Sequence, residues 1–552
     1  MSATLFHGGR VHVRAGVSAE ALLQRDGRVA AVGSASDLAR EAGRAERVDL
    51  RGGLMVPGWF DAHVHFMWWG FQMAEVDLRA AATTEAALAT VEARAAELPK
   101  GQWLTGGRFD KNRWGRWPTA AELDRVTGDR PTVLRSRDGH SRWLNTAALR
   151  AAAITAATKP PAGGAILRDA RGEPTGIVQE RANELADRAV PTVSEAECQA
   201  ALARAQEEAL RRGVTGVESL EQASSYAAFR RAHDRGRLAV RVVMGIPHRS
   251  LGSSGPILTP APPQIRDGGA GTVRAANGRF DFESAIETGM RSGDGDEWLR
   301  LGHVQFFTDG ALGSQTAALE EPYEGSEDRG ILTFDPLELR ADVARAAAAG
   351  LAVAIHAIGD QAVRVALDAI APTRVTTPGL RQRVEHVQLV REEDLGRFGA
   401  LGIVASMQPI HATSDRDLAD RYWGPRRTPR AYPWRTLLER GTILAFGSDA
   451  PVEPIDPLLG LHAALTRRRP TDPEAWFPSQ RLTLDEALDA YSAGAAYATA
   501  GERDWGTLDR GMRCDATVLD RDLATLHEDE LLEAKVRATI TDGVVRFADG
   551  LG

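Results

Sequence analysis

The sequence predicts an α/β protein built around a (β/α)8 TIM barrel, together with a composite β-sandwich domain from both termini and an inserted subdomain. Three observations lead to this prediction. Short apolar runs alternate with helical stretches along the middle of the chain, β-rich segments lie near both ends, and a long stretch separates the first apolar run from the second. Fully apolar strands that alternate with helices are typical of a parallel sheet.

Short β-rich segments, separated by turn residues, lie near each terminus. Dipeptides typical of hairpins, Asp26-Gly27 and Asp542-Gly543, support this interpretation. We therefore predict a small composite β-sandwich domain formed by residues 1–57 and 506–552. The segments are 3–13 and 27–33 near the N-terminus, and 515–520 and 536–548 near the C-terminus.

The barrel prediction rests on eight apolar runs, the number of strands in a (β/α)8 barrel. Each run is followed by polar residues and then by a stretch rich in Ala, Leu, Glu and Arg. We expect the barrel to occupy residues 58–505. The runs are 54–60, 214–218, 239–244, 302–307, 351–355, 383–387, 402–406 and 442–447.

The stretch after the first run is too long for a loop, because connections within domains are usually a few residues long. We therefore predict an inserted subdomain at about residues 66–195. It is rich in tryptophan and arginine. Its tryptophans, such as Trp103 and Trp114, form either an aromatic wall beside a binding site or the small core of the insertion.

Composition excludes several classes of protein. The net charge of −8, from 67 basic and 75 acidic residues, argues against nucleic acid or an anionic membrane as the main partner. No apolar run reaches the ~18 residues of a transmembrane helix, and the N-terminus lacks the pattern of a signal peptide. With only Cys198 and Cys514, a disulfide framework or a cysteine-rich zinc module is excluded. We expect a cytoplasmic protein.

Four histidines and an aspartate lie at or just past the ends of apolar runs, where barrel enzymes place their active sites. His63 and His65 follow the first run, and residues i and i+2 of an extended segment share a face. His356, His386 and Asp449 end later runs. A lone histidine at a strand end is more often a structural group, but five such ligands on one rim favour a metal centre. Imidazole and carboxylate suit zinc and related divalent ions.

At this point the sequence resembles a known family. Segments around the rim residues are similar to the amidohydrolase superfamily, and three further segments resemble its "amidohydrolase 3" branch, which includes N-substituted formamide deformylases. The resemblance covers nearly the whole chain, and GTLDRGMRCDATVLD is similar to the closing segment of the family. The first group is PGWFDAHVHF, IHAIGDQAV, EHVQ and GSDAPVEP; the second is DGHSRWLN, PTGIVQE and FFTDGALGSQTAAL.

The resemblance implies a metal-dependent hydrolase. It implies that His63 and His65 are metal ligands from the first strand, and that His356 and His386 are ligands from strands five and six. It implies that Asp449 binds the metal and acts as the general base. A bound divalent ion lowers the pKa of water from 15.7 to about 7. Asp449 then takes the proton and hands it to the leaving nitrogen. If the metal is held by His63, His65 and Asp449, His386 instead hydrogen-bonds the nucleophile or the substrate.

One position departs from the family. Many members of the branch carry a lysine on the fourth strand that becomes carboxylated and bridges two metals. Here HVQFFTDG places Gln305 at that position, and all four lysines of the chain lie outside the predicted barrel strands. A neutral amide offsets the repulsion of two cations less than an anion would. We therefore predict one tightly bound metal, most simply Zn²⁺, and a weak or absent second.

The arrangement around that metal is left open at two points. We favour a tight site built by His63, His65 and Asp449, with His356 able to join it, and the converse pair of His356 with His386 is the alternative. Gln305 either contacts the metal or its ligands, or points into the barrel and hydrogen-bonds a neighbour.

Two further residues are candidates for substrate binding. Asp309 follows the fourth strand, and His140 lies in the insertion within an Asp-Gly-His segment that resembles one of the family. The alternative for His140 is that it packs within the insertion.

We expect a small-molecule substrate with an amide-type C–N bond other than a peptide bond, and no nucleic acid or membrane partner. A homodimer is one assembly that the sequence leaves open. The first alternative is deaminase-type hydrolysis of a ring amidine at a mononuclear metal site. Such enzymes usually carry Glu three residues after the fifth-strand histidine, whereas Gly359 stands here, before Asp360. The second is a catalytically inactive regulatory or binding protein, which the retained rim residues disfavour.

Overall fold

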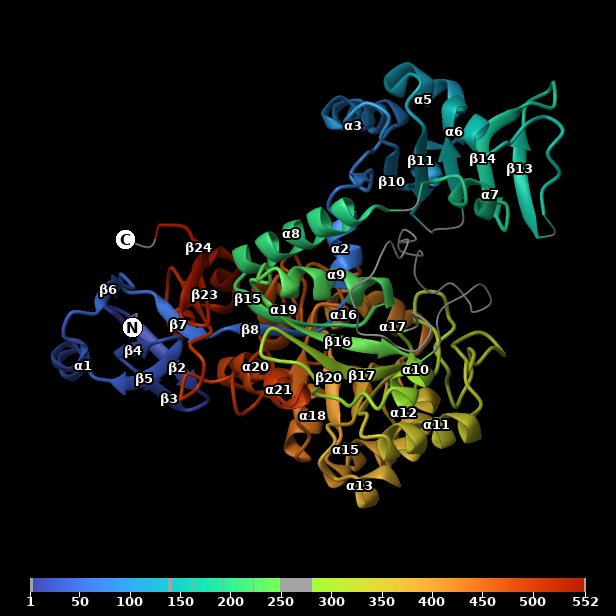
Figure 1. The fold of residues 1–552 in the computed structure, drawn as a ribbon. Helices are drawn as coiled ribbons and strands as arrows, with labels where there is room; N and C mark the ends of the chain where they lie inside the picture. Colours follow the sequence, from blue (N-terminus) through green and yellow to red (C-terminus); the bar gives the residue numbers. More distant parts are fainter. Residues whose placement is uncertain are drawn as a thin grey trace. The chain divides into compact units, whose positions relative to one another are not determined.

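The computed structural model describes residues 3–137, 141–161, 163–191, 193–221, 223–248 and 280–550. The chain divides into two compact units. The first holds Met1–Trp69 and most of the chain from Leu202 onward, and the second holds Gly70–Ala201. Figure 1 shows the elements of both in sequence colours.

Eight parallel strands form the sheet at the centre of the first unit, in the order β21-β20-β19-β18-β17-β16-β15-β8, and this sheet is a nearly closed barrel. Each of the eight predicted runs overlaps one strand. The strands are almost wholly buried, as expected for a sheet covered on both faces. They are β8 (Trp59–Val64), β15 (Val214–Ser219), β16 (Arg241–Pro247), β17 (Leu299–Phe307), β18 (Val353–Ala357), β19 (Arg383–His386), β20 (Val404–Met407) and β21 (Leu444–Phe446).

The first predicted run is in fact two strands. Residues 54–60 are divided between β7 (Leu54–Pro57) and β8, and β7 belongs to a different sheet. Both halves are apolar and buried, so hydrophobicity alone does not separate them. Gly58 stands between the two strands. Only glycine fits there without a shift, because a Cβ atom would lie 2.4 Å from the hydroxyl oxygen of Thr215.

Helices alternate with the barrel strands and cover them. Helix α12 illustrates how they do so. Its buried residues include Ala362, Val363, Ala366, Leu367 and Ile370, whose spacing gives the helix one apolar face. Among the described helices, none is long and apolar enough to cross a membrane. The helices that follow the barrel strands are α9 (Ala223–Asp234), α10 (Phe282–Glu287), α11 (Pro336–Ala348), α12 (Asp360–Ile370), α13 (Thr373–Thr376), α14 (Glu392–Leu395), α15 (Arg397–Leu401), α16 (Pro409–Ser414), α17 (Arg416–Tyr422), α18 (Trp434–Glu439), α19 (Pro457–Thr466), α20 (Leu484–Ala490) and α21 (Ala493–Ala498).

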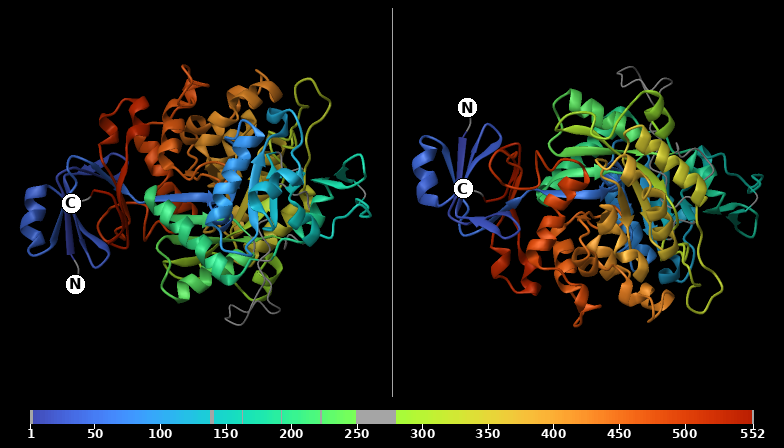
Figure 2. Two further views of the ribbon diagram at one scale, coloured as in Figure 1. Left: turned by 90° about the horizontal axis from the view of Figure 1, so that it is seen from above. Right: turned by 90° about the horizontal axis from the view of Figure 1, so that it is seen from below.

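Strands from both ends of the chain share one sheet, as the terminal β-rich segments predicted. Its order is β24-β23-β22-β7-β2-β3, and a second sheet has the order β5-β4-β1-β6. Figure 2 shows the blue and red strands side by side in both views. The terminal strands are β1 (Ala3–His7), β2 (Arg10–Arg14), β3 (Val17–Ala19), β4 (Ala21–Arg25), β5 (Arg28–Gly33), β6 (Glu46–Asp49), β22 (Ala516–Leu519), β23 (Val536–Thr541) and β24 (Val544–Ala548), with α1 (Ala35–Ala42) between β5 and β6.

Side chains of both terminal sheets enter one buried cluster, which includes Phe6, Val11, Leu22, Cys514 and Ile540. The buried Cys514 is therefore a core residue. The exact limits of a β-sandwich domain, at residues 57 and 506, stay predictions.

The second unit contains a six-stranded sheet with the order β13-β14-β12-β11-β10-β9. Its tryptophans form its core: the Trp143 and Phe109 ring centroids lie 5.8 Å apart, and those of Trp114 and Phe109 lie 5.5 Å apart. The elements are β9 (Val76–Asp77), α3 (Thr84–Glu97), β10 (Leu104–Phe109), α4 (Lys111–Trp114), α5 (Ala120–Thr127), β11 (Thr132–Ser136), β12 (Ser141–Leu144), α6 (Thr146–Ala151), β13 (Gly164–Arg168), β14 (Pro174–Glu180) and α7 (Asn183–Asp187). α2 (Phe66–Gln72) precedes them, and α8 (Glu195–Arg211) follows them.

Candidate metal centre

The seam of the barrel brings the first and last strands together. The backbone N–H of Asp449 donates to the carbonyl of His63 (2.7 Å), and the N–H of His65 donates to the carbonyl of Ala450 (2.8 Å). Gly447 permits this approach, because a Cβ atom there would lie 2.5 Å from the backbone nitrogen of His63. Residues almost 400 positions apart in the chain are thus neighbours at the carboxyl ends of the strands.

Asp449 lies between histidines on two sides. Its Oδ1 is 3.5 Å from Nε2 of His63 and 3.2 Å from Nε2 of His65. Its Oδ2 is 3.7 Å from Nε2 of His411. Two sets of three ligand atoms therefore gather within 4.8 Å of one another: one in His63, His65 and Asp449, the other in His386, His411 and Asp449.

Hydrogen bonds at Nδ1 orient the two histidines of the first set. Nδ1 of His63 lies 2.7 Å from Oε2 of Glu385, and Nδ1 of His65 lies 2.6 Å from the carbonyl of Leu220. Carboxylate and carbonyl oxygens only accept, so Nδ1 carries the proton in each ring. Nε2 is then the nitrogen left to bind a metal, the arrangement usual for ligating histidines.

The electrostatics of the centre favour a cation. Burial lowers the pKa of His63, but Asp449 and Glu385 outweigh burial and raise the pKa to about 10. Burial acts to raise the pKa of Asp449, yet His63 and His65 hold this pKa well below its ordinary value. The pKa of His386 is well below its ordinary value because of burial and of the neighbouring His356 and His63. The site thus offers an anionic carboxylate beside a neutral imidazole.

Several polar atoms at the centre are buried without a hydrogen-bond partner. They are Oδ1 of Asp449, Nε2 of His411, Nε2 of Gln408 and Oε1 of Gln388. Such an atom costs about 1–3 kcal/mol when nothing compensates it, and most buried polar groups in proteins are paired. A bound cation would supply the missing partner for the aspartate and the histidine.

The backbone is also strained here. His386, Val387 and Asp449 have φ angles of +71°, +47° and +59°. Non-glycine residues with positive φ are uncommon, and each such conformation costs on the order of 1–3 kcal/mol. Strain of this kind is characteristic of functional sites.

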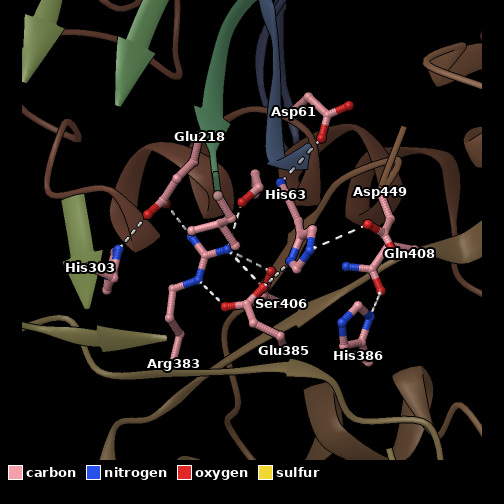
Figure 3. Close-up of polar contacts among 12 residues, drawn as sticks. Asp61, His63, Glu218, His303, Arg383, Glu385, His386, Ser406, Gln408 and Asp449 are labelled. Atoms are coloured by element: carbon pink, nitrogen blue, oxygen red, sulfur yellow. Dashed lines mark hydrogen bonds and ion pairs between the residues drawn. The ribbon is translucent and has the colours of Figure 1, made fainter. Parts of the chain in front are cut away.

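A network of charged side chains lies beneath the centre, inside the barrel (Figure 3). Arg383 donates from Nη1 to Glu218 Oε2 (2.5 Å) and from Nε to Glu385 Oε1 (2.5 Å). Its Nη2 reaches Glu385 Oε2, Ser406 Oγ and the carbonyl of Ala62. Glu218 also pairs with Nδ1 of His303 (2.6 Å). Through Glu385, this network holds His63.

His356 belongs to neither set of ligand atoms in this structure. Its Nε2 is 3.1 Å from the carbonyl of Gly310 and 3.3 Å from Oδ1 of Asp309. Its ring centroid nevertheless lies 4.6 Å from that of His386, so it borders the second set.

The two substrate-binding candidates have different outcomes. Asp309 is fully buried, and its carboxylate accepts hydrogen bonds from the N–H groups of Ala318, Ile358 and Gly359. This geometry favours a role in holding the turns around His356 over contact with substrate. His140 lies outside the described residues. Gln305 is buried on β17, and its backbone carbonyl accepts from His248 N–H (3.2 Å).

Three residues of the site were missed by the sequence analysis: His411, Glu385 and Gln408. His411 follows β20 by four residues, in SMQPIH, so the rule that named the other rim residues applies to it too. Glu385 and Gln408 carried no such signal, since their partners His63 and His386 are identified only by the fold.

Comparison with known proteins places these observations in a family. The family model described as "Amidohydrolase family" matches residues 46–547. The protein LONG AFTER FAR-RED 3 of Arabidopsis thaliana is 32% identical, over 91% of this chain and 84% of that protein. An N-substituted formamide deformylase of Arthrobacter pascens is 28% identical, over 96% of this chain and 95% of that protein. A crystal structure of an uncharacterized metal-dependent hydrolase from Pyrococcus horikoshii is similar with a TM-score of 0.76 and 27% identity, over 96% and 99% of the two chains.

Proposed function

We propose that this chain, which belongs to the amidohydrolase family, is a metal-dependent hydrolase that cleaves an amide-type C–N bond with Asp449 as the general base. One observation carries the proposal: a buried carboxylate oxygen without a hydrogen-bond partner lies between two histidine Nε2 atoms.

The residues present fit a divalent cation. His63 and His65 each keep Nε2 free because Nδ1 has an oxygen acceptor, and Asp449 supplies an anionic oxygen. Two nitrogens and one oxygen form a set that zinc accepts in catalytic sites, with a position left for water. We therefore propose zinc at His63, His65 and Asp449. When bound, the ion supplies a water molecule whose pKa is near 7 rather than 15.7.

The chain's own residues then handle the proton. Asp449 accepts it from the attacking oxygen at a carboxylate oxygen and delivers it to the nitrogen as the C–N bond breaks. His386, kept neutral by burial and by its histidine neighbours, is placed to hydrogen-bond the nucleophile or the substrate. Glu385 fixes the orientation of the His63 ring through the hydrogen bond from Nδ1.

The deaminase alternative gains no support from the described residues. Asp360, the nearest acid after His356, begins helix α12, and its carboxylate accepts from the N–H of Glu320 (3.0 Å). Asp360 also belongs to neither set of ligand atoms at the centre. An N-acyl or N-formyl amine is the substrate class that we propose, because the formamide-hydrolysing relative matches nearly the whole chain.

The test is a screen of N-acyl and N-formyl amines with the purified protein, in which the released amine is quantified. We expect turnover of at least one member of this class, and a loss of turnover in His65→Asn. The matched control is His7→Asn, a histidine of the terminal sheet, which should leave turnover unchanged. Release of ammonia from ring amidines, with no turnover of any amide, would contradict the proposal.

A further inference from the structure

We propose that Gln408 is a further catalytic residue of this centre, whose amide nitrogen Nε2 donates a hydrogen bond to the carbonyl oxygen of the substrate. The hydrogen bond stabilises the negative charge that this oxygen gains while the C–N bond is cleaved. The inference rests on the proposed function, because it concerns the same centre and an amide-type substrate. It goes beyond that function by assigning the side chain that recognises the carbonyl oxygen.

The position of Gln408 in the fold directs its side chain into the barrel. Gln408 follows strand β20 directly and precedes Pro409, the first residue of α16. Its backbone is extended, with φ of −119° and ψ of 104°, as is usual for the residue before a proline. Residues i and i+2 of an extended segment share a face, so Gln408 lies on the face of Ser406, whose Oγ accepts from Arg383 inside the barrel (2.9 Å). Gln408 therefore points inward, one layer nearer to the carboxyl ends of the strands.

The oxygen and the nitrogen of this amide have different surroundings. Oε1 lies 2.9 Å from Nδ1 of His386, and this contact fixes the orientation of the amide. Nε2 carries two hydrogens, and among the described residues it has no hydrogen-bond partner although it is buried. Buried donors in proteins are nearly always paired. The nitrogen is therefore placed to donate to a group that the substrate brings.

Nε2 of Gln408 differs from the other unpartnered atoms of the centre in what it can offer. Oδ1 of the ionised Asp449 and Oε1 of Gln388 only accept hydrogen bonds, and Nε2 of His411 donates only when it carries a proton. Of these four atoms, Nε2 of Gln408 alone donates at every pH. The amide is also uncharged, so it does not repel the divalent ion that we propose beside it.

This donor lies among the side chains that surround the proposed reaction. Figure 3 shows the amide of Gln408 between Asp449 and His386. The ring centroid of His386, the partner of Oε1, lies 4.8 Å from that of His63 and 4.6 Å from that of His356. A substrate that is attacked at this centre brings its carbonyl group among these side chains, where Gln408 supplies a neutral donor.

The hydrogen bond acts most strongly at the point where charge develops. The attacking oxygen forms a bond to the carbonyl carbon, and the π-electron pair of C=O moves onto the carbonyl oxygen. That pair then re-forms C=O, while the nitrogen leaves with the electron pair of the C–N bond and takes the proton carried by Asp449. The negative charge on the carbonyl oxygen exists only between these two steps. An interaction that strengthens there raises kcat rather than lowering KM.

The test compares two variants of the full chain on a substrate from the amine screen, with the metal content of each measured. Gln408→Glu keeps an oxygen that accepts from His386 but replaces the donor by a second acceptor, and Gln408→Leu removes both. In both variants kcat should fall about 10²–10³-fold, as on removal of other such donors, while KM and metal content change little. The matched control is Gln24→Glu, in which a buried glutamine of the terminal sheet loses its donor to Thr4. It should keep wild-type kcat.

An inhibitor provides a readout that a merely structural role would not move. A phosphonate analogue of the same substrate carries negative charge on its oxygens, as the tetrahedral intermediate does. Its inhibition constant should rise in both Gln408 variants in step with the loss of kcat/KM, because transition-state analogues depend on the interactions that stabilise the transition state. An unchanged inhibition constant would contradict the inference.

The outcomes separate this inference from the proposed function. A wild type that hydrolyses no amide would overturn both. Amide hydrolysis with wild-type kcat in either variant would overturn the role of Gln408 alone, and retention in Gln408→Glu only would show that Gln408 orients His386. A loss of kcat that accompanies a loss of bound metal would overturn it as well. If neither variant folds, Gln408→Asn, which withdraws the donor by one methylene group, should lower kcat likewise, and wild-type kcat in it would contradict the inference.

Discussion

The rim of the barrel and the network beneath it are both buried and both rich in charge, yet they differ in how their polar atoms are satisfied. In the network, every polar side-chain atom of Arg383, Glu385 and Glu218 has a partner. At the rim, Asp449 and His411 each keep a buried atom without one.

This difference distinguishes the network from the rim, although unpartnered buried atoms also occur elsewhere, for example Nε1 of Trp434 and Oγ1 of Thr541. A fully paired buried network fixes one arrangement of the chain, whereas a partly paired one is costly unless something else completes it. Burial alone would not distinguish the regions, because Glu385 and Asp449 are both nearly inaccessible to solvent. What distinguishes the rim is that its unpartnered atoms belong to a carboxylate and an imidazole that face each other, the groups that a cation would pair.

His63 joins the two regions. Its Nδ1 belongs to the network through Glu385, and its Nε2 faces Asp449 at the rim. Substitutions on the two sides of this ring should consequently have different effects. Those at the rim should change activity, and those in the network should change stability or metal affinity.

The largest effect is expected at the rim. Asp449→Asn keeps an oxygen ligand but cannot accept a proton, so kcat should fall about 10²–10⁴-fold. The circular dichroism spectrum and the unfolding midpoint should change little, because the side chain keeps its volume. Steady-state kinetics on a substrate from the amine screen provides the measurement. Wild-type kcat in this variant would contradict the role of Asp449.

In the network the expected effect is on stability. Arg383→Met leaves Glu218 and Glu385 buried without their cation, which typically costs about 3–5 kcal/mol. Denaturant unfolding of the metal-free protein measures it. The control is Arg188→Met, which removes an exposed pair with Glu184, and such pairs contribute about 0–1 kcal/mol. Equal losses in the two variants would break the distinction between the regions.

Glu385→Gln tests the link between them. Glutamine can still accept from His63, but it no longer offers Arg383 two anionic oxygens. We expect the metal affinity of the site formed by His63, His65 and Asp449 to fall about 10–100-fold, as for other outer partners of ligating histidines. A competition assay with a chelator of known affinity measures this. An unchanged metal affinity at this site would show that the network serves stability alone.

The smallest effect is expected from Gln305→Lys. In the presence of bicarbonate, a carboxylated lysine would add an anion to the site. The affinity for a second metal ion, which the sequence predicts to be weak or absent, should then rise by on the order of tenfold. Metal titration with and without bicarbonate measures the change. If neither the substitution nor bicarbonate changes the affinity for a second metal ion, the charge argument for a weak second site does not hold.

Much of this arrangement could be predicted from the sequence. The apolar runs correspond to the eight barrel strands, and one rule, polar residues at the ends of those runs, named His63, His65, His356, His386 and Asp449. The run at 54–60 was misjudged because its two halves are equally apolar but belong to different sheets.

The rest depends on contacts between distant positions. Arg383 and Glu218 are separated by 165 positions, and no local pattern pairs them. His411 followed the same rule as the other rim residues, but it stands a few positions further from its strand. His356 was named by its place at the end of a run and by the resemblance, and its Nε2 lies beside Gly310 and Asp309 in the fold.

Metal content measured together with activity tests the central claim most directly, namely that the unpartnered rim atoms hold a divalent cation needed for hydrolysis. Elemental analysis of the purified protein should find at least one divalent transition metal per chain. Prolonged chelation should remove both metal and activity, and added Zn²⁺ should restore them in the wild type but not in His63→Asn. Activity that survives chelation, with no metal found by elemental analysis, would contradict the account.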